Sequence, residues 1–237
     1  MDNLEYIKES ARILLFFKPV ANKLYPSIIH HPYISSNPTP FQNKDGSLCF
    51  IDIFKEKDKY SELLNQKLEL IDKAESFDLL VYMINKPYKL FFFDINKHVL
   101  SKETYNQQLK EIWCLTEFPN ADKNVSTNES LELFKNADKT IIMDKEELSK
   151  FQHLPDEITI YRGTHKRNNS NALSWTDNYE IALWYAKRFG GNGYVLQATI
   201  KKEDVVAYFQ YRYDDELIID FNKIYNLKAE KIMNIKI

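Results

Sequence analysis

The hydrophobic pattern of this chain changes near Leu154-Pro155-Asp156. Before this point, apolar residues recur at helical spacing, as in segments 4–17, 60–74 and 105–115. After it, short apolar runs of strand length follow one another, and a single amphipathic segment at 177–189 interrupts them. This order predicts an α+β protein in which a mainly helical region, residues 1–150, precedes a β-sheet domain, residues 151–237.

The expected elements can be placed along both regions. In the first, we expect helices at 4–17, 60–74, 77–84, 105–115, 131–137 and 144–151, and a strand at 48–54. Segment 88–93 fits a helix or a buried strand, and the prolines from Pro26 to Pro40 predict an irregular loop. In the second, we expect strands at 158–161, 173–176, 193–200, 205–209, 216–220 and 231–237. Asp177, with Glu180 three residues later, predicts the N-cap of the helix at 177–189.

Composition excludes several classes of protein. The net charge of −2 gives no overall signal for nucleic-acid binding, and five glycines argue against a glycine-rich phosphate loop. Two cysteines are too few for a disulfide framework, and the five histidines show no metal-ligand spacing, so we expect no metal. The start of the chain does not resemble a secretory signal, and no apolar run is long enough to span a membrane. We therefore expect a cytoplasmic protein with no membrane association.

Three short motifs in the last third of the chain carry possible chemistry. Arg162-Gly163 ends an apolar run, Ser174-Trp175-Thr176 precedes the amphipathic helix, and Asp214-Asp215-Glu216 opens another apolar run. Each motif is only two or three residues long, so each is weak by itself. Their order and context give them weight together.

The acidic motif suits the cleavage of a glycosidic bond. When such a bond breaks, positive charge develops on the sugar, and a carboxylate at the position of Glu216 would stabilise it. In an extended backbone Asp214 lies on the same face, where a second acid could orient or deprotonate a nucleophile. The alternative is that these acids are surface residues beside a turn.

The other two motifs suit the binding of a dinucleotide. Arg162 could clamp a diphosphate, and Gly163 would let a planar ring approach the backbone. The alternative for Arg162 is an ordinary ion pair at a strand end. Ser174 and Thr176 could hold a ribose or the catalytic carboxylate, or they could simply cap the following helix.

The arginine, the Ser-x-Thr and the acid-x-Glu motifs, in this order, resemble the ADP-ribosyltransferase family, over about residues 158–220. The resemblance implies a split β-sheet domain at 151–237 that binds NAD as a substrate. It implies that Arg162 contacts NAD and that Gly163 offers backbone groups to the nicotinamide amide. It also implies that Ser174 positions the catalytic Glu216, with support from Thr176.

The family comparison leaves the acceptor of the ADP-ribose open. The segment before the acidic motif usually faces the target, which here means Tyr211, Arg212 and Tyr213. Asp214 stands where arginine-modifying relatives carry Glu and several others carry Gln. The shorter carboxylate of Asp214 leaves undecided whether the acceptor is a protein or a nucleic acid.

The sequence therefore predicts a mono-ADP-ribosyltransferase that modifies an intracellular protein or nucleic acid. By analogy with relatives, it would be a toxin or an effector in phage conflict, with an inhibitor or antitoxin as a possible partner. The alternatives are an NAD glycohydrolase and a non-enzymatic binding module with the same fold. Residues 1–150 would recognise the target or a partner, or support the sheet domain.

Overall fold

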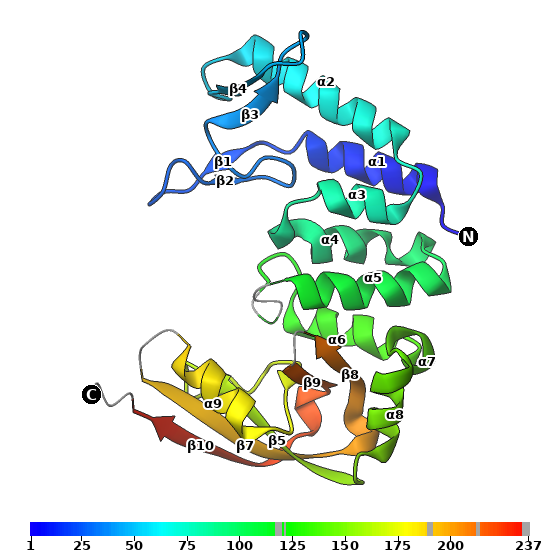
Figure 1. Cartoon of the computed structure of the whole chain (residues 1–237), viewed down its shortest axis with the longest axis vertical. Helices are drawn as coiled ribbons and strands as arrows, with labels where there is room; N and C mark the ends of the chain where they lie inside the picture. Colours follow the sequence, from blue (N-terminus) through cyan, green and yellow to red (C-terminus); the bar gives the residue numbers. More distant parts are fainter. Residues whose placement is uncertain (117–119, 121, 189–191, 212–213, 234–237) are drawn as a thin grey trace. The chain divides into compact units, whose positions relative to one another are not determined.

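The computed structural model describes residues 1–116, 120, 122–188, 192–211 and 214–233. It confirms the predicted mixture of helices and strands, as expected of an α+β protein. The chain forms two compact units, Met1–Gln108 and Leu109–Ile237 (Figure 1). No helix within the described residues has the length and apolar character needed to cross a membrane.

The first unit is built from helices and two small hairpins. Its predicted helices are confirmed, and the ambiguous segment 88–93 is helical. Its helices are α1 (Leu4–Leu15), α2 (Lys57–Lys73), α3 (Phe77–Met83), α4 (Lys86–Asn96), the short 3₁₀ helix Lys97–Val99 and the first half of α5 (Lys102–Leu115). Its antiparallel hairpins pair β1 (Val20–Ala21) with β2 (Ile29–His30) and β3 (Thr39–Gln42) with β4 (Leu48–Ile51). The segment from Pro26 to Pro40, expected to be irregular, therefore contributes to both hairpins.

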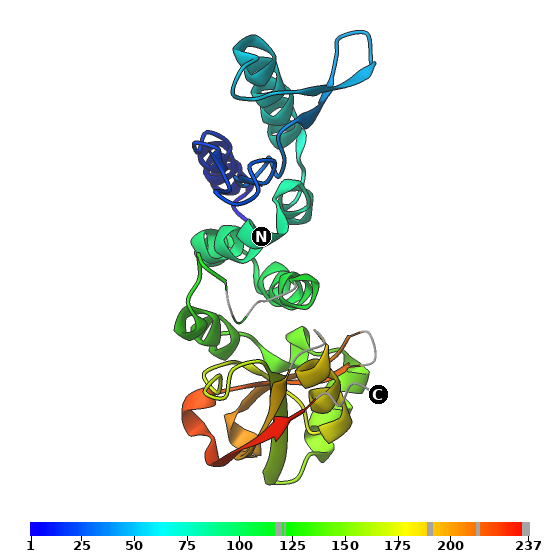
Figure 2. The same ribbon diagram turned by 90° about the vertical axis from the view of Figure 1, so that its left-hand side faces the viewer.

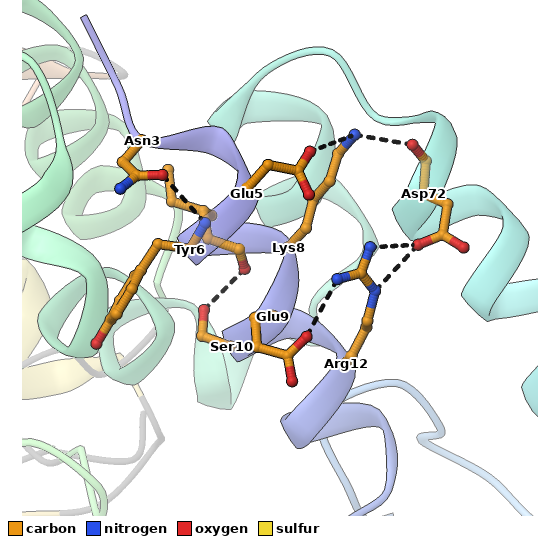
Figure 3. Close-up of polar contacts among 9 residues, drawn as sticks. Asn3, Glu5, Tyr6, Lys8, Glu9, Ser10, Arg12 and Asp72 are labelled. Carbon is orange, nitrogen blue, oxygen red and sulfur yellow. Dashed lines mark hydrogen bonds and ion pairs between the residues drawn. The ribbon is translucent and has the colours of Figure 1, made fainter.

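Helices α1, α3 and α4 pack against one another, and Figure 2 views their axes nearly end-on. Their apolar faces bury aromatic rings, among which Phe77 and Phe92 stack with centroids 5.4 Å apart. The outer face of α1 is joined to α2 by polar contacts (Figure 3). Arg12 donates to one oxygen of Asp72 at 2.7 and 3.0 Å, and Lys8 donates to the backbone carbonyl of Asp72 at 2.8 Å.

The second unit begins earlier than the predicted boundary. It contains the end of α5, then α6 (Thr127–Lys135), α7 (Lys139–Ile142) and α8 (Lys145–His153). These helices belong with the sheets because α6, α7 and α8 all pack on strand β8 (Val205–Tyr211). The change in hydrophobic pattern near residue 155 marks a change of secondary structure, which does not coincide with the boundary between the compact units.

Two three-stranded antiparallel sheets follow these helices in the second unit. One has the order β10-β7-β5, and the other has the order β6-β9-β8. Their strands are β5 (Glu157–Thr164), β6 (Ser174–Trp175), β7 (Gly193–Lys201), β9 (Asp214–Ile219) and β10 (Tyr225–Ile232), in addition to β8. Short 3₁₀ helices at Lys202–Asp204 and Phe221–Lys223 precede β8 and β10. The last strand lies earlier than the predicted 231–237, and residues 234–237 are outside the described part.

A β-bridge joins the two sheets. The backbone N–H of Tyr161 in β5 donates to the carbonyl of Thr176 at 2.7 Å, and the N–H of Thr176 donates back at 2.9 Å. Thr176 directly follows β6, so this pair of hydrogen bonds connects the outer strand of each sheet. The bridge therefore fixes the position of β6 relative to β5.

Helix α9 (Tyr179–Lys187) covers the β10-β7-β5 sheet (Figure 1). The prediction of Asp177 as its N-cap is wrong, because Asn178 occupies that position and its side chain accepts from the N–H of Glu180 at 2.9 Å. An Asn side chain caps a helix as well as Asp does, so the sequence did not discriminate between the two neighbours.

A buried carboxylate connects α8, α5 and β8. Glu147 is 1% exposed and accepts from the backbone N–H of Gln210 at 3.0 Å and from that of Asp144 at 2.9 Å. It also forms an ion pair with Lys110 on α5. A buried charge is tolerated when it has this many donors. Removing the charge would leave the two N–H groups without this acceptor and Lys110 with the more distant carboxylate of Asp144, at 3.8 Å.

We expect Glu147→Ala to lower the free energy of unfolding by about 3 kcal/mol, because it removes the close partner of a partly buried lysine and the acceptor of two N–H groups. The neighbouring Glu146→Ala is the control, since the side chain of Glu146 is 76% exposed and its pair with Lys150 is a surface contact. It should cost less than about 1 kcal/mol. Urea unfolding followed by tryptophan fluorescence measures the free energy of unfolding of both variants, because all three tryptophans lie in the second unit. Equal losses in the two variants would contradict the role given to Glu147.

Candidate active site

Three of the predicted site residues lie on three strands that meet at the junction of the two sheets. Arg162 is on β5, Ser174 begins β6, and Glu216 is on β9. Ser174 pairs with Ile218 across β6 and β9, so Ser174 lies on the same face as Ile218 and as Glu216, two residues away. The sheet register therefore places the serine and the glutamate side by side.

Hydrogen bonds join these three residues. The hydroxyl of Ser174 donates to Oε1 of Glu216 in a short contact. Arg162 donates through Nη1 to the backbone carbonyl of Ser174 at 2.6 Å. Ser174 thus contacts both of the other residues, through its hydroxyl on one side and its carbonyl on the other.

Arg162 is a cation with restricted access to water. Burial lowers the pKa of its guanidinium from its ordinary value to about 10, and the negative charge of Glu216 acts in the opposite direction. Arg162 therefore remains protonated at neutral pH. Its Nε is buried, and none of the residues that the structure describes forms a hydrogen bond with it. An unsatisfied buried donor on a cation is costly, and a bound anion would relieve that cost.

The sequence did not point to two further residues at this site. Trp113, near the end of α5, donates through its indole Nε1 to Oε1 of Glu216 at 3.1 Å. Asn120 accepts through Oδ1 from the backbone N–H groups of Leu173 and Ser174, at 2.7 and 3.4 Å. Trp113 belongs to the apolar face of a helix and Asn120 to a polar segment rich in Asn. No local pattern distinguishes either from an ordinary core or loop residue.

Gly163 has a packing role that was not anticipated. A Cβ atom built on it would lie 2.0 Å from the carbonyl oxygen of Ala182 and 2.6 Å from the amide nitrogen of Ala186, both in α9. Glycine is therefore required for the helix to approach β5 this closely. The backbone role that the resemblance gives to Gly163 stays a prediction.

Thr176 has a structural role at the junction of the two sheets. Its side chain is buried, and its hydroxyl oxygen accepts from the N–H of Asn178 at 3.1 Å at the start of α9. Its backbone forms the bridge to Tyr161. Thr176 therefore supports the position of β6.

The acidic motif is extended, as expected, and Asp214 begins β9 opposite Tyr211. The side chain of Asp214 lies outside the described part of the structure, as do Arg212 and Tyr213, so their predicted roles stay predictions. Asp215 lies on the other face of β9 from Glu216, where it accepts from the hydroxyl of Tyr208 and from Gln210.

Cys114 lies close enough to Glu216 to sense its charge. Burial raises the pKa of the Cys114 thiol to about 12, and the charge of Glu216 adds to this rise. The thiol is therefore protonated at neutral pH and is a poor nucleophile. Among the described residues, no group of three or more His, Cys, Asp or Glu side chains is placed to hold a metal ion.

We expect Gly163→Ala to lower the free energy of unfolding by about 2–3 kcal/mol, because the new methyl group meets backbone atoms of α9 that cannot turn away. The control is Thr159→Ala, at an exposed position on the same strand, which should cost less than about 1 kcal/mol. Thermal or urea unfolding of both variants provides the comparison. A Gly163→Ala protein as stable as the control would show that α9 can shift without cost.

The arrangement combines a partly buried cation, a hydroxyl and a carboxylate held by two donors. Such a set can bind an anionic group and stabilise positive charge that develops nearby. Comparison of the chain with models of protein families, with curated proteins and with solved structures finds no match. The chemistry of the site therefore rests on Arg162, Ser174 and Glu216 themselves.

Proposed function

We propose that this protein is an NAD-dependent mono-ADP-ribosyltransferase whose catalytic carboxylate is Glu216. The observation that carries the proposal is the hydrogen bond from Ser174 to Glu216, with Arg162 bonded to the same serine. The three residues come from three strands and were selected from the sequence for this chemistry. The resemblance to the ADP-ribosyltransferase family assigns them to NAD binding and to cleavage of the nicotinamide–ribose bond.

The proposed reaction has two linked events. The bond between C1′ of the ribose and the nicotinamide nitrogen breaks, and its electron pair leaves with the nicotinamide, which becomes neutral. A lone pair of the acceptor attacks C1′, and the acceptor then loses its proton. Glu216 stabilises the positive charge on the ribose between these events, because its carboxylate is already oriented before the charge forms.

Arg162 would bind the diphosphate of NAD. Its guanidinium is charged at neutral pH, and among the described residues its buried Nε has no hydrogen-bond partner. Phosphate oxygens are good acceptors for arginine, and a hydrogen bond between charged groups contributes more than a neutral one. The bond from Nη1 to the Ser174 carbonyl would hold the guanidinium beside the carboxylate while NAD is bound.

The backbone of Gly163 supports a role for it toward nicotinamide. In an antiparallel ladder, the N–H and C=O of one residue point to the same edge of the strand, and the edge alternates along the chain. Tyr161 uses both groups toward Thr176, so those of Gly163 point to the same edge of β5. Within the described residues, no bridge joins Gly163 to β6. Its N–H and C=O could therefore bind a ligand at this edge.

The acceptor would be an intracellular protein or nucleic acid, presented to the segment around Tyr211, Arg212 and Tyr213. By analogy with the family, the biological role would be that of a toxin or a phage-conflict effector controlled by an inhibitor. Incubation with labelled NAD, with and without a cell extract, tests the transfer. Label on protein or nucleic acid supports a transferase. Nicotinamide release at the same rate with and without the extract supports a glycohydrolase. The absence of any reaction would contradict both functions.

We expect Glu216→Gln to lower the rate of nicotinamide release by about 10²–10³-fold, because the neutral amide cannot stabilise the charge on the ribose. The matched control is Asp215→Asn, one residue away on the opposite face of β9, where it bonds to Tyr208 and Gln210. This control should retain most of the activity. Wild-type rates in folded Glu216→Gln protein, or an equal loss in both variants, would refute the assignment of Glu216.

We expect Arg162→Lys to weaken NAD binding by about tenfold or more, because lysine keeps the charge but lacks the planar fork of donors. The control is Arg167→Lys, because Arg167 is an exposed arginine on the segment that follows β5. Calorimetric titration with NAD measures both affinities. An unchanged affinity in Arg162→Lys would leave Arg162 with a purely structural role at the sheet junction.

A further inference from the structure

The carboxylate of Glu216 receives a second hydrogen bond from outside both sheets. The indole Nε1 of Trp113 donates to the same oxygen, Oε1, that accepts from Ser174, at 3.1 Å. Trp113 lies on α5, 103 residues before Glu216 in the chain. No motif in the sequence connects the two residues.

The indole is held firmly in place. Trp113 is 1% exposed and packs edge-on against Phe134 of α6, with ring centroids 5.0 Å apart at an interplanar angle of 89°. Phe134 in turn contacts Phe209 of β8 at 6.1 Å, and Phe209 is the direct partner of Glu216 in the β8–β9 ladder. Because cross-strand partners share a face, Phe209 and Glu216 both point toward this aromatic cluster.

The surroundings make the bond strong and directional. An N–H donor to a carboxylate gives a charge-assisted hydrogen bond, and an apolar environment strengthens it because water competes less. Two donors on one oxygen, from α5 and from β6, restrict rotation of the carboxylate. The hydrogen bond also favours the ionised form of the acid over the neutral form.

We propose that Trp113 is a positioning residue that orients Glu216 and keeps it ionised for catalysis. This inference rests on the proposed function, in which Glu216 is the catalytic carboxylate. Trp113 itself does not contact the reacting atoms. Its effect passes through the hydrogen bond to Oε1.

The kinetic test compares two buried tryptophans. Trp113→Phe keeps an aromatic ring and removes the N–H that reaches Glu216. Trp175→Phe is the matched control, since Trp175 is 2% exposed and its Nε1 donates to the backbone carbonyl of Ala172 at 2.9 Å. Both changes reduce the size of a buried ring, so a loss caused by loosened packing would occur in both.

We expect Trp113→Phe to lower kcat for nicotinamide release by about tenfold or more, with KM for NAD changed less than about twofold. The acidic limb of its pH–rate profile should move to higher pH, because the ionised carboxylate has lost a donor. The control should retain both kcat and the position of the limb. Wild-type kcat and an unmoved limb in Trp113→Phe, or equal changes in the control, would overturn the proposal.

A second measurement needs neither NAD turnover nor a tryptophan variant. The chain has three tryptophans, so a ¹⁵N-labelled protein gives three indole N–H signals. One signal should shift with pH in the wild-type protein and lose that shift in Glu216→Gln, while the other two stay unchanged. If no signal depends on Glu216, Trp113 does not sense the carboxylate and the proposal fails. If this dependence is present but no variant acts on NAD, the proposed function fails while the contact stands.

Discussion

The pair of backbone hydrogen bonds between Tyr161 and Thr176 holds the candidate site together. It joins the β10-β7-β5 sheet to the β6-β9-β8 sheet at the strands that carry Arg162 and Ser174. The β6–β9 register then brings Glu216 next to Ser174. A shift of one residue at either pairing would turn side chains to the opposite face and separate the three groups. Backbone pairing therefore decides whether these residues form a site.

Helices of the second unit add contacts to the candidate site that the two sheets form. The aromatic cluster of Trp113, Phe134 and Phe209 lies along the face of β8 and β9 that carries Glu216. Asn120 holds the backbone at the start of β6 from the segment after α5. One oxygen of the carboxylate thus has two oriented donors, from α5 and from β6, and such preorganised donors prepare a charged group before it is needed. The end of α5 and the helices α6 to α8 therefore belong with the sheets in the second unit.

Much of the architecture followed from local patterns. Helices α1, α2, α3 and α5 were expected from apolar spacing, and so were β5, β7 and β8, whereas the segment that forms α4 fitted a helix or a strand. The candidates Arg162, Ser174 and Glu216 were also found from the sequence, because the order and context of the three short motifs carry weight that no single motif has. The division into compact units falls after Gln108, well before the change in hydrophobic pattern near residue 155, because helices α6 to α8 pack on β8 through contacts that are distant in sequence.

The sequence by itself determined the types of secondary structure and the chemical identity of the three site residues. Periodicity and residue type are local properties, so they can be read without knowing the fold. Only the tertiary structure decided that Trp113 bonds to Glu216, that Gly163 makes room for α9, and that Ser174 contacts both charged groups. These facts depend on strand register and on packing between segments far apart in the chain. No short stretch of sequence contains that information, because the contacts exist only once the sheets and helices have assembled.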